Sequence, residues 1–328
     1  MSEKKLMEQA ISIFDDKGKD SVKLAKLEIF KEEIQNSSLE YAVKFFMDKW
    51  NDILHPALLR LACEAVGGNP DATTQIGAAI VLLAGGADIH DDIIDQSTAK
   101  GTNQTVFGKF GVDIAVLAGD ALLLKGLYLL HESCDLLALA KKRRILKIVK
   151  EAFLESSSAE AMEASLRGKT DVEGEKILHL IRQKVATAEA VTRIGAVLGN
   201  ATERNITVLG HYGRSIGMLM TLRDEFVDIF EADELANRAE REILPLPILL
   251  AMNDETRKGR LLNFLKKGKK LSEEDIDEVL DLSLETQSTR DLLEFMKNLI
   301  MDEKNRLSSL VRDKNILELL LDATLENL

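Results

Sequence analysis

Proline is scarce in this sequence. Its 328 residues include only four prolines, and the 174 residues between Pro70 and Pro245 contain none. Proline interrupts helices more strongly than any other residue, because its ring removes a helical hydrogen bond and clashes with the preceding turn. Aromatic residues are also few, at 5%, whereas 45% of the residues are hydrophobic. The composition therefore predicts long helices packed around a large core.

Three further absences exclude whole classes of protein. The two cysteines, Cys63 and Cys134, are too few for a disulfide framework, which favours a reducing cytoplasm. A net charge of −12 leaves no basic footprint for a phosphate backbone, so we expect no nucleic-acid partner. The N-terminus carries no apolar signal region, and no uninterrupted apolar run reaches about eighteen residues. We therefore expect a soluble, cytoplasmic protein that does not span a membrane.

Apolar residues recur with helical spacing along most of the chain. The segments between helices, such as 67–70, 100–105 and 167–169, do not resemble domain linkers, and no strand pattern stands out. The predicted helices span residues 3–15, 21–35, 38–49, 54–66, 71–96, 112–133, 138–165, 173–200, 203–231, 243–252, 256–266, 273–283, 287–311 and 314–327. We therefore predict a single all-α domain over residues 1–328.

Four carboxylates lie at the end of an apolar segment. Asp88, Asp91, Asp92 and Asp95 are spaced so that all four share one face of a helix, where they repel one another unless cations lie between them. Oxygen ligands of this kind suit Mg²⁺ or Mn²⁺, ions that commonly bridge protein carboxylates to substrate phosphates. The pattern predicts a metal site that binds phosphate or diphosphate. A solvated acidic helix end is the alternative.

A second acidic group follows another apolar segment. It contains Asp224, Glu225 and Asp228, with the two aspartates four residues apart. If two antiparallel helices direct both acidic groups into one cavity, their five or six carboxylates can hold a small cluster of divalent ions around a diphosphate. Two unrelated acidic surfaces are the alternative.

Together with several shorter segments, the acidic groups resemble motifs of the trans-isoprenyl diphosphate synthases, the enzymes that make geranyl, farnesyl and geranylgeranyl diphosphates. The likeness extends from about residue 50 to 252. The segment His90-Asp91-Asp92-Ile93-Ile94-Asp95 is similar to the family's first aspartate-rich motif. The segment Asp224-Glu225-Phe226-Val227-Asp228 is similar to the second, with Glu225 in place of its middle aspartate. The shorter matching segments are 56–59, 62–68, 109–111, 116–120 and 244–246.

The resemblance implies an isoprenoid-synthase-like bundle of long, mostly antiparallel helices around a central cavity. It also implies a magnesium site, with Mn²⁺ as a substitute, whose ligands are Asp91, Asp92, Asp95, Asp224, Glu225 and Asp228. In the family, the metal-bound diphosphate of an allylic substrate leaves, and isopentenyl diphosphate attacks the resulting carbocation. The metals neutralise the leaving group, and an apolar cavity shelters the cation from water. The catalytic residues implied by this likeness are Asp91, Asp92 and Lys184.

The sequence departs from the family where isopentenyl diphosphate binds. The family's basic run Gly-Lys-Arg-x-Arg-Pro reads Asn51-Asp52-Ile53-Leu54-His55-Pro56 here, so a lysine becomes Asp52 and an arginine becomes Ile53. Lys100 stands where the family has an arginine pair. Lys184-Val185 stands in place of a Lys-Thr pair, for which Gln183 is another match. Arg241 stands in place of a later lysine. The diphosphate-binding residues that remain are His55, Lys100, Lys184 and Arg241. Losing several charge-assisted contacts predicts weak binding of isopentenyl diphosphate.

Three functions remain open on this comparison. The first is condensation of an allylic prenyl diphosphate with isopentenyl diphosphate through an eroded second site. The second is ionisation or lysis of a prenyl diphosphate without condensation, as in the helical terpene synthases. The third is a non-catalytic subunit that binds prenyl diphosphates and pairs with an active homologue. Retained carboxylate clusters count against the third function, because such clusters destabilise a fold that binds no metal.

Three smaller expectations complete the prediction. Gly86 and Ala87 precede Asp91 by about one helical turn, where the family limits tail length, so their small size predicts a longer product; ordinary helix packing is the alternative.

The apolar face of residues 112–130 exceeds what one cavity wall requires and, with the resemblance, predicts a homodimer. His90 directly precedes the predicted metal ligands, and we expect it to make a hydrogen bond that orients these ligands or supports the structure, rather than to react.

Overall fold

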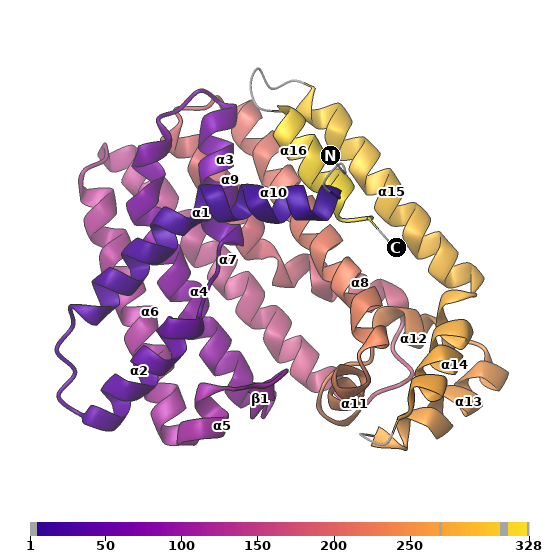
Figure 1. Ribbon diagram of the computed structural model, residues 1–328. Helices are drawn as coiled ribbons and strands as arrows, with labels where there is room; N and C mark the ends of the chain where they lie inside the picture. Colours follow the sequence, from indigo (N-terminus) through magenta and orange to yellow (C-terminus); the bar gives the residue numbers. More distant parts are fainter. Residues whose placement is uncertain (1–4, 269–270, 309–313, 327) are drawn as a thin grey trace.

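The protein is built from α-helices, and the predicted all-α fold is confirmed (Figure 1). The structure, a computed structural model, describes residues 5–268, 271–308, 314–326 and 328. The longer helices are α1 (Leu6–Phe30), α2 (Ser37–Lys49), α3 (Leu54–Ala65), α4 (Thr74–Ile94), α6 (Val112–Asp135), α7 (Leu139–Leu166), α8 (Gly174–Lys184), α9 (Ala186–Leu198), α10 (Glu203–Val227), α11 (Ala232–Arg241), α13 (Glu255–Leu265), α14 (Glu273–Leu284), α15 (Gln287–Leu307) and α16 (Lys314–Ala323). The shorter elements are α5 (Val106–Phe110), α12 (Leu246–Ala251) and the 3₁₀ turns η1 (Pro70–Thr73) and η2 (Asp228–Phe230).

The core of the described residues is continuous. Buried hydrophobic side chains form one cluster that includes residues from Ala10 to Ala323. Cys63 and Cys134 are buried members of this cluster and are both free thiols. A core shared by the first and last helices supports the single domain, which stays a prediction.

α4 lies at the centre of the arrangement and is buried along most of its length. It packs most extensively against α6, and also against α1 and α3. Two glycines allow α4 and α6 to approach closely. A Cβ atom on Gly86 would lie 2.8 Å from the carbonyl oxygen of Gly119, and one on Gly126 would lie 3.0 Å from that of Ala79. Larger residues would push the helices apart, so these contacts fix where the acidic end of α4 points.

α9 makes a second close contact, with α3 on one side and α10 on the other. A Cβ atom on Gly195 would lie 2.1 Å from the carbonyl oxygen of Leu59, and one on Gly213 would lie 2.3 Å from that of Ala188. Neither position can accept a side chain without moving backbone. This packing brings the first turns of α3 and α9 together beside the cavity described below.

Several helices differ from the prediction. The helices predicted over 3–15 and 21–35 form one helix, α1, because a missing side chain at Gly18 leaves room for the carbonyl oxygen of Ile53, 2.4 Å from a Cβ built there. The single helix predicted over 173–200 divides at Val185 into α8 and α9. Neither α5 nor α11 was predicted. The predicted helix ends at residues 3, 311 and 327 lie outside the described residues.

A small hairpin corrects the expectation of a chain without strands. β1 (Ala99–Lys100) pairs antiparallel with β2 (Asn103–Gln104). Gly101 in the turn between them has a φ of +56°, which glycine adopts without strain. Two residues per strand are too few to show the alternation by which strands are predicted. The hairpin sets Lys100 beside the acidic end of α4.

The segment Pro70–Ile94 has the length and composition of a membrane-spanning helix, with a mean hydropathy of 1.4. However, 67% of its most apolar stretch is buried inside the protein. The central helix of a soluble protein meets the same criteria. The position of α4 in the core therefore accounts for its hydropathy.

Candidate active site

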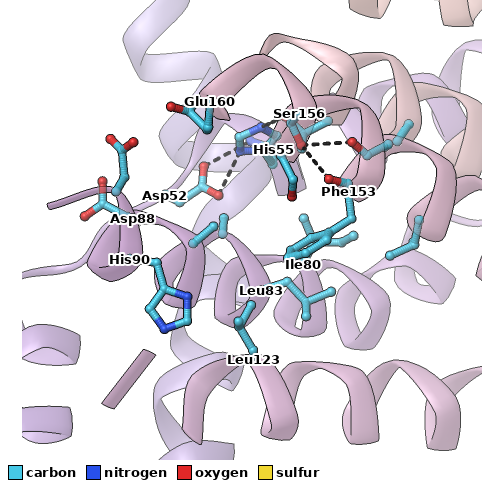
Figure 2. Close-up of a pocket in the computed structure, with 18 of the residues that line it drawn as sticks. Asp52, His55, Ile80, Leu83, Asp88, His90, Leu123, Phe153, Ser156 and Glu160 are labelled. Carbon is cyan, nitrogen blue, oxygen red and sulfur yellow. Dashed lines mark hydrogen bonds and ion pairs between the residues drawn. The ribbon is translucent and has the colours of Figure 1, made fainter. Parts of the chain in front are cut away.

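A cavity of about 830 Å³ lies beside the acidic end of α4 (Figure 2). Its walls come from α3, α4, α6, α7 and α9, and the loop before α3. Apolar side chains form its body, including Ile80, Leu83 and Leu123. Polar side chains, Asp52, His55, Ser156 and Glu160 among them, gather at the other end in Figure 2. The volume and the apolar body with a few polar groups are typical of a small-molecule site.

Gly86 and Ala87 contribute differently to this cavity. Ala87 lines it, together with Leu83 and Ala84 from the preceding turn. Gly86 faces α6, where an added Cβ would meet Leu123 and the Gly119 backbone. Helix packing therefore explains Gly86, whereas the small side chain of Ala87 widens the cavity.

The first acidic group holds a lysine. The Nζ of Lys100 donates to Asp88 Oδ1 at 2.7 Å and lies 3.0 Å from Asp92 Oδ1. The pKa of Asp92 is raised to about 6, chiefly by burial. The charges of Asp88 and Asp91 contribute to this rise, and the charge of Lys100 opposes it. Burial lowers the pKa of Lys100, but the two carboxylates outweigh burial and raise it overall. Lys100 therefore stays charged in this group.

Asp91 differs from its neighbours. It lines the cavity, and its Oδ1 atom is buried without a hydrogen-bond partner among the described residues. Asp92 Oδ1 also lacks a hydrogen bond there, but it lies 3.0 Å from the Nζ of Lys100 and outside the cavity lining. Leaving a charged oxygen buried and unpaired is costly, so such an atom is expected to receive a ligand. Asp91 is therefore the carboxylate in this group that is open to a cation.

Asp95 is paired with an arginine that the sequence analysis did not identify. Arg167, which follows α7, donates to Asp95 and, at 2.7 Å, to the backbone oxygen of Ile94. Burial raises the pKa of Asp95 to about 6, as does the charge of Asp91. The pair ties the end of α7 to the end of α4.

The second acidic group surrounds another unpredicted arginine. Arg238 of α11 donates to Glu225 at 2.8 Å, to Asp228 at 2.7 Å and to the backbone oxygen of Ile243 at 2.9 Å. The other carboxylate oxygen of Glu225 accepts the backbone N–H of Leu246 at 2.6 Å. Glu225 thus joins α10, α11 and the start of α12. Burial raises the pKa of the third acid, Asp224, to about 6, and the charges of Asp228 and Glu225 add to this.

The two acidic groups are linked through α11. Arg241 at its C-terminal end donates to the backbone oxygen of Gln96 at 2.6 Å, just beyond α4. The charge of Asp95 also helps to raise the pKa of Glu242 to about 7, although burial is the larger cause. Asp224, Glu225 and Asp228 are, however, not among the described residues that line the cavity. That the two groups share metal ions stays a prediction.

Lys184 is held by two glutamates of α7. Its Nζ lies 3.2 Å from Glu160 Oε1 and forms a closer pair with Glu163. Burial lowers the pKa of Lys184, but the charges of both glutamates outweigh this and raise it overall. Burial raises the pKa of Glu160 to about 7, a shift that Lys184 opposes and Asp91 increases. Lys184 does not line the cavity, whereas Glu160 does.

His55 belongs to a hydrogen-bonded chain at the polar end of the cavity. Its Nδ1 lies 2.9 Å from Asp52 Oδ2, and its Nε2 lies 3.1 Å from the hydroxyl of Thr187. All three residues line the cavity. Burial lowers the pKa of His55, but the charge and hydrogen bond of Asp52 outweigh burial, so the pKa is raised. The family's lysine position is thus occupied by a carboxylate that holds an imidazole.

His90 points toward α6 rather than toward the carboxylates of the first acidic group. Its Nε2 lies 3.3 Å from the backbone oxygen of Val116 and 3.4 Å from Asp120 Oδ1. Its ring also fills the space beside Gly119, where a Cβ would lie 2.4 Å from Nε2. These contacts give His90 a role in packing α4 on α6.

The predicted site did not include Arg167, Arg238 or Thr187. Arg238 had a usable signal, because residues 232–241 carry acids in the first turn and arginines in the last, as helices commonly do. Arg167 and Thr187 had none, since their partners lie 72 and 132 residues away in the sequence.

As the side chains stand, no group of three or more His, Cys, Asp or Glu residues in the described ranges is arranged to hold a metal ion. Lys100, Arg167 and Arg238 are instead paired with the acids. The donor set still fits Mg²⁺ in its chemistry, because it consists of carboxylate oxygens and includes the unpartnered oxygen of Asp91.

Comparisons with known proteins agree with this fold. The polyprenyl synthetase family model matches residues 46–283. A short chain isoprenyl diphosphate synthase of Methanothermobacter thermautotrophicus is 29% identical over 182 residues, so the alignment spans only 55% of either chain. A geranylgeranyl diphosphate synthase of Methanosarcina mazei is 26% identical over 79% of this chain and 78% of its own.

Solved structures extend the likeness of fold to nearly the whole chain. The geranylgeranyl pyrophosphate synthetase from Pyrococcus horikoshii superposes with a TM-score of 0.85 at 24% identity, covering 98% of this chain and 99% of its own. A polyprenyl synthetase from Streptomyces coelicolor superposes with a TM-score of 0.82 at 20% identity, covering 96% and 99%. The family match confirms the resemblance drawn from the aspartate motifs: the chain belongs to the polyprenyl synthetase family.

Proposed function

We propose that this protein is a Mg²⁺-dependent prenyltransferase that binds an allylic prenyl diphosphate, with the hydrocarbon tail in the cavity and the diphosphate at the acidic end of α4. One observation carries the proposal. An apolar cavity of about 830 Å³ is lined at one end by Asp91, whose Oδ1 is buried without a hydrogen-bond partner among the described residues. The unpartnered oxygen of Asp91 would bind the metal that holds the diphosphate, and the apolar walls would contact the hydrocarbon tail.

Magnesium would be held by Asp91, Asp92 and Asp95 on one side and by Asp224, Glu225 and Asp228 on the other, with Mn²⁺ as a substitute. When bound, the metal would neutralise the charge that develops on the leaving diphosphate. Asp91 and Asp92 act by holding the metal, and Lys184 acts by stabilising the diphosphate.

The chain's own residues have two further tasks. Lys100, Lys184 and Arg241 supply the positive charge that would bind diphosphate oxygens, exchanging their present acceptors for the ligand. Ile80, Leu83 and Leu123 exclude water from the tail and from a carbocation formed beside it. The size of Ala87 favours a longer rather than a shorter tail.

Isopentenyl diphosphate is the acceptor that family membership suggests, and we infer that it binds weakly. Asp52 and Ile53 occupy positions where the family carries basic residues, and His55 is hydrogen bonded to Asp52 at 2.9 Å. Each lost charge-assisted contact to a partly buried phosphate is worth roughly 1.5–3 kcal/mol, so losing two lowers affinity by about two to four orders of magnitude.

The same observation favours a second candidate function, the ionisation of a prenyl diphosphate without condensation. The Asp52–His55–Thr187 chain is complete without any phosphate ligand, because each side chain has its hydrogen-bond partner within the protein. Condensation and ionisation share the acidic end of the cavity and differ only in what attacks the cation.

We also propose that the protein is a cytoplasmic homodimer. The side chains of Leu124, Leu127 and Tyr128 on α6 are 71%, 52% and 58% exposed, and a contiguous apolar face of this kind commonly marks a protein interface. Sedimentation at micromolar concentration tests the dimer, and Leu124→Glu should shift it to monomer. The two buried free thiols are consistent with a reducing compartment.

One assay tests the proposed function. Purified protein with Mg²⁺ is given labelled isopentenyl diphosphate and, in turn, dimethylallyl, geranyl and farnesyl diphosphate. Condensed products with a high Michaelis constant for isopentenyl diphosphate support condensation through an eroded site. Diphosphate release without condensation supports the second candidate. A low micromolar constant would contradict the eroded site, and release of no diphosphate from any substrate would contradict both functions.

A further inference from the structure

The Asp52–His55–Thr187 chain has the geometry of a positioned base. Asp52 accepts hydrogen bonds from both His55 Nδ1, at 2.9 Å, and the His55 backbone N–H, at 3.2 Å. A carboxylate beside Nδ1 fixes the proton on that nitrogen. Nε2 is then the acceptor, so the Thr187 hydroxyl, 3.1 Å away, donates to it. The nitrogen that can take up a proton therefore faces a hydroxyl at the cavity wall.

The charges around this chain disfavour an anionic second substrate. The titratable groups lining the cavity are Asp52 and His55 from the start of α3, Asp88, His90 and Asp91 from α4, and Glu160 from α7. The described lining includes no lysine or arginine. Lys184 on α8 pairs with Glu160 and Glu163, lies outside this lining, and is assigned above to the diphosphate of the allylic substrate. A diphosphate placed here would meet carboxylates without a matching cation, whereas a neutral hydroxyl compound would meet hydrogen-bonding groups that suit it.

We propose that water is the prenyl acceptor in this cavity, and that His55 takes the proton of that water through the hydroxyl of Thr187. The inference rests on the proposed function, since it needs a prenyl cation formed from a prenyl diphosphate. The C–O bond to diphosphate breaks, the water oxygen forms a new bond to the cationic carbon, and the water proton passes to Thr187 Oγ1. Thr187 passes its own proton to His55 Nε2. The products are a prenyl alcohol, free diphosphate and a protonated imidazole, which returns its proton to solvent.

Asp52 acts as a positioning residue in this scheme. It holds Nε2 toward Thr187 and stabilises the imidazolium that forms. Because Asp52 also raises the pKa of His55, the rate of alcohol formation should increase as pH rises through that pKa. Asp52→Asn should move the midpoint of this increase to lower pH, which the loss of a purely structural contact would not do.

The test uses the full chain with Mg²⁺ and farnesyl diphosphate in water enriched in ¹⁸O, without isopentenyl diphosphate. Diphosphate release and farnesol formation are measured separately. Capture of a cation by water places ¹⁸O in the alcohol, whereas contaminating phosphatase places it in phosphate. A reaction without protein corrects for spontaneous solvolysis.

Four variants sharpen the test. His55→Gln should lower labelled alcohol formation by about 100-fold, with the Michaelis constant for farnesyl diphosphate changed less than threefold. Thr187→Val should act in the same direction, and Thr187→Ser should restore the rate because it keeps the hydroxyl. His179→Gln, an exposed histidine of α8, should change nothing. Unchanged melting temperatures identify losses that are not caused by unfolding.

The outcomes separate the inference from the proposed function. Labelled farnesol that depends on His55 and on the Thr187 hydroxyl supports the inference. Diphosphate release without labelled farnesol, or labelled farnesol unaffected in His55→Gln and Thr187→Val, overturns it and leaves the proposed function standing. No diphosphate release under any condition overturns both.

Discussion

The two acidic groups of this protein are neutralised in different ways. In the first group, Lys100, whose side chain is 52% exposed, pairs with Asp88 and Asp92, Arg167 pairs with Asp95, and one oxygen of Asp91 has no hydrogen-bond partner among the described residues. In the second, Arg238 is the cation, its side chain is 9% exposed, and it bridges Glu225 and Asp228 while also donating to a backbone oxygen. A lysine whose side chain is half exposed exchanges its partners at lower cost than a buried arginine that is hydrogen bonded to several acceptors.

This difference indicates that similar aspartate motifs have taken on unlike tasks. We expect Lys100 to exchange its carboxylate partners for a ligand more readily than Arg238 does. In the second group, Glu225 also accepts the N–H of Leu246 at 2.6 Å, so it holds α12 in place. We therefore expect the first group to take up the metal more readily, and the second group to contribute to stability in addition to its proposed role in holding the metal.

The largest expected effect is on stability, in the second group. Arg238→Ala leaves Glu225 buried without its cation, which typically costs about 3–5 kcal/mol. Urea unfolding measures the change. Arg193→Ala is the matched control, since Arg193 pairs with a single glutamate at 3.4 Å and is 33% exposed, and it should cost less than about 1 kcal/mol. Similar losses in both variants would contradict the difference between the groups.

The next effect is on activity, in the first group. Asp91→Asn removes the carboxylate charge with little change of shape, and should lower Mg²⁺-dependent diphosphate release by about 100-fold or more. Its free energy of unfolding should stay the same or rise, because a buried charge is lost. Asp281→Asn on the exposed face of α14 is the control. Retention of more than a tenth of the activity would place the metal elsewhere.

A smaller effect concerns pH. Asp92, Asp95 and Asp224 have pKa values raised to about 6, so between pH 4 and 6 the folded state binds protons that the unfolded state has lost. Without metal, the contribution of these groups to stability should therefore be greatest below pH 4, should fall by roughly 1–3 kcal/mol between pH 4 and 6, and should change little above pH 7.

Mg²⁺ should flatten this dependence, because it favours the ionised carboxylates. Urea unfolding at several pH values, with Mg²⁺ or with a chelator, measures both curves. Asp92→Asn should reduce the slope of the metal-free curve. Stability that rises between pH 5 and 7.5 without metal would show that these carboxylates are stabilised in their charged form, contrary to the burial described above.

The smallest effect is on metal affinity. Lys100 competes with a divalent cation for Asp88 and Asp92, so Lys100→Met should tighten Mg²⁺ binding by up to about tenfold in the absence of diphosphate. Calorimetry measures the dissociation constant. Lys147→Met, on the exposed face of α7, should leave it unchanged. The same Lys100 variant should weaken prenyl diphosphate binding, because the lysine can then no longer contact the diphosphate.

Much of this arrangement could be predicted from the sequence, for a physical reason. Helical periodicity is local, so the scarcity of proline and the spacing of apolar residues predicted the all-α fold and the helices that carry both acidic groups. The acidic motifs are local as well. Their resemblance to one family was confirmed by the family match over residues 46–283.

Features that depend on distant contacts could not be predicted. α1 continues through Gly18 because the carbonyl oxygen of Ile53 occupies the space where a side chain would lie, and the break at Val185 lies against Gly217 of α10. The hairpin at Lys100 is too short for a pattern. The role of Asp52 was predicted only as the loss of a lysine, because its partnership with His55 and Thr187 depends on how α9 packs against α3.

The apolar cavity has a thermodynamic consequence. Its volume of about 830 Å³ corresponds to on the order of 25 water molecules at liquid density. A prenyl tail that replaces solvent there buries apolar surface, so binding should show a negative heat-capacity change, and its enthalpy should become more negative on warming. Each added isoprene unit should steepen this slope until the tail outgrows the cavity. The tail length at which the heat-capacity change stops growing would then measure the depth of the cavity, without any turnover.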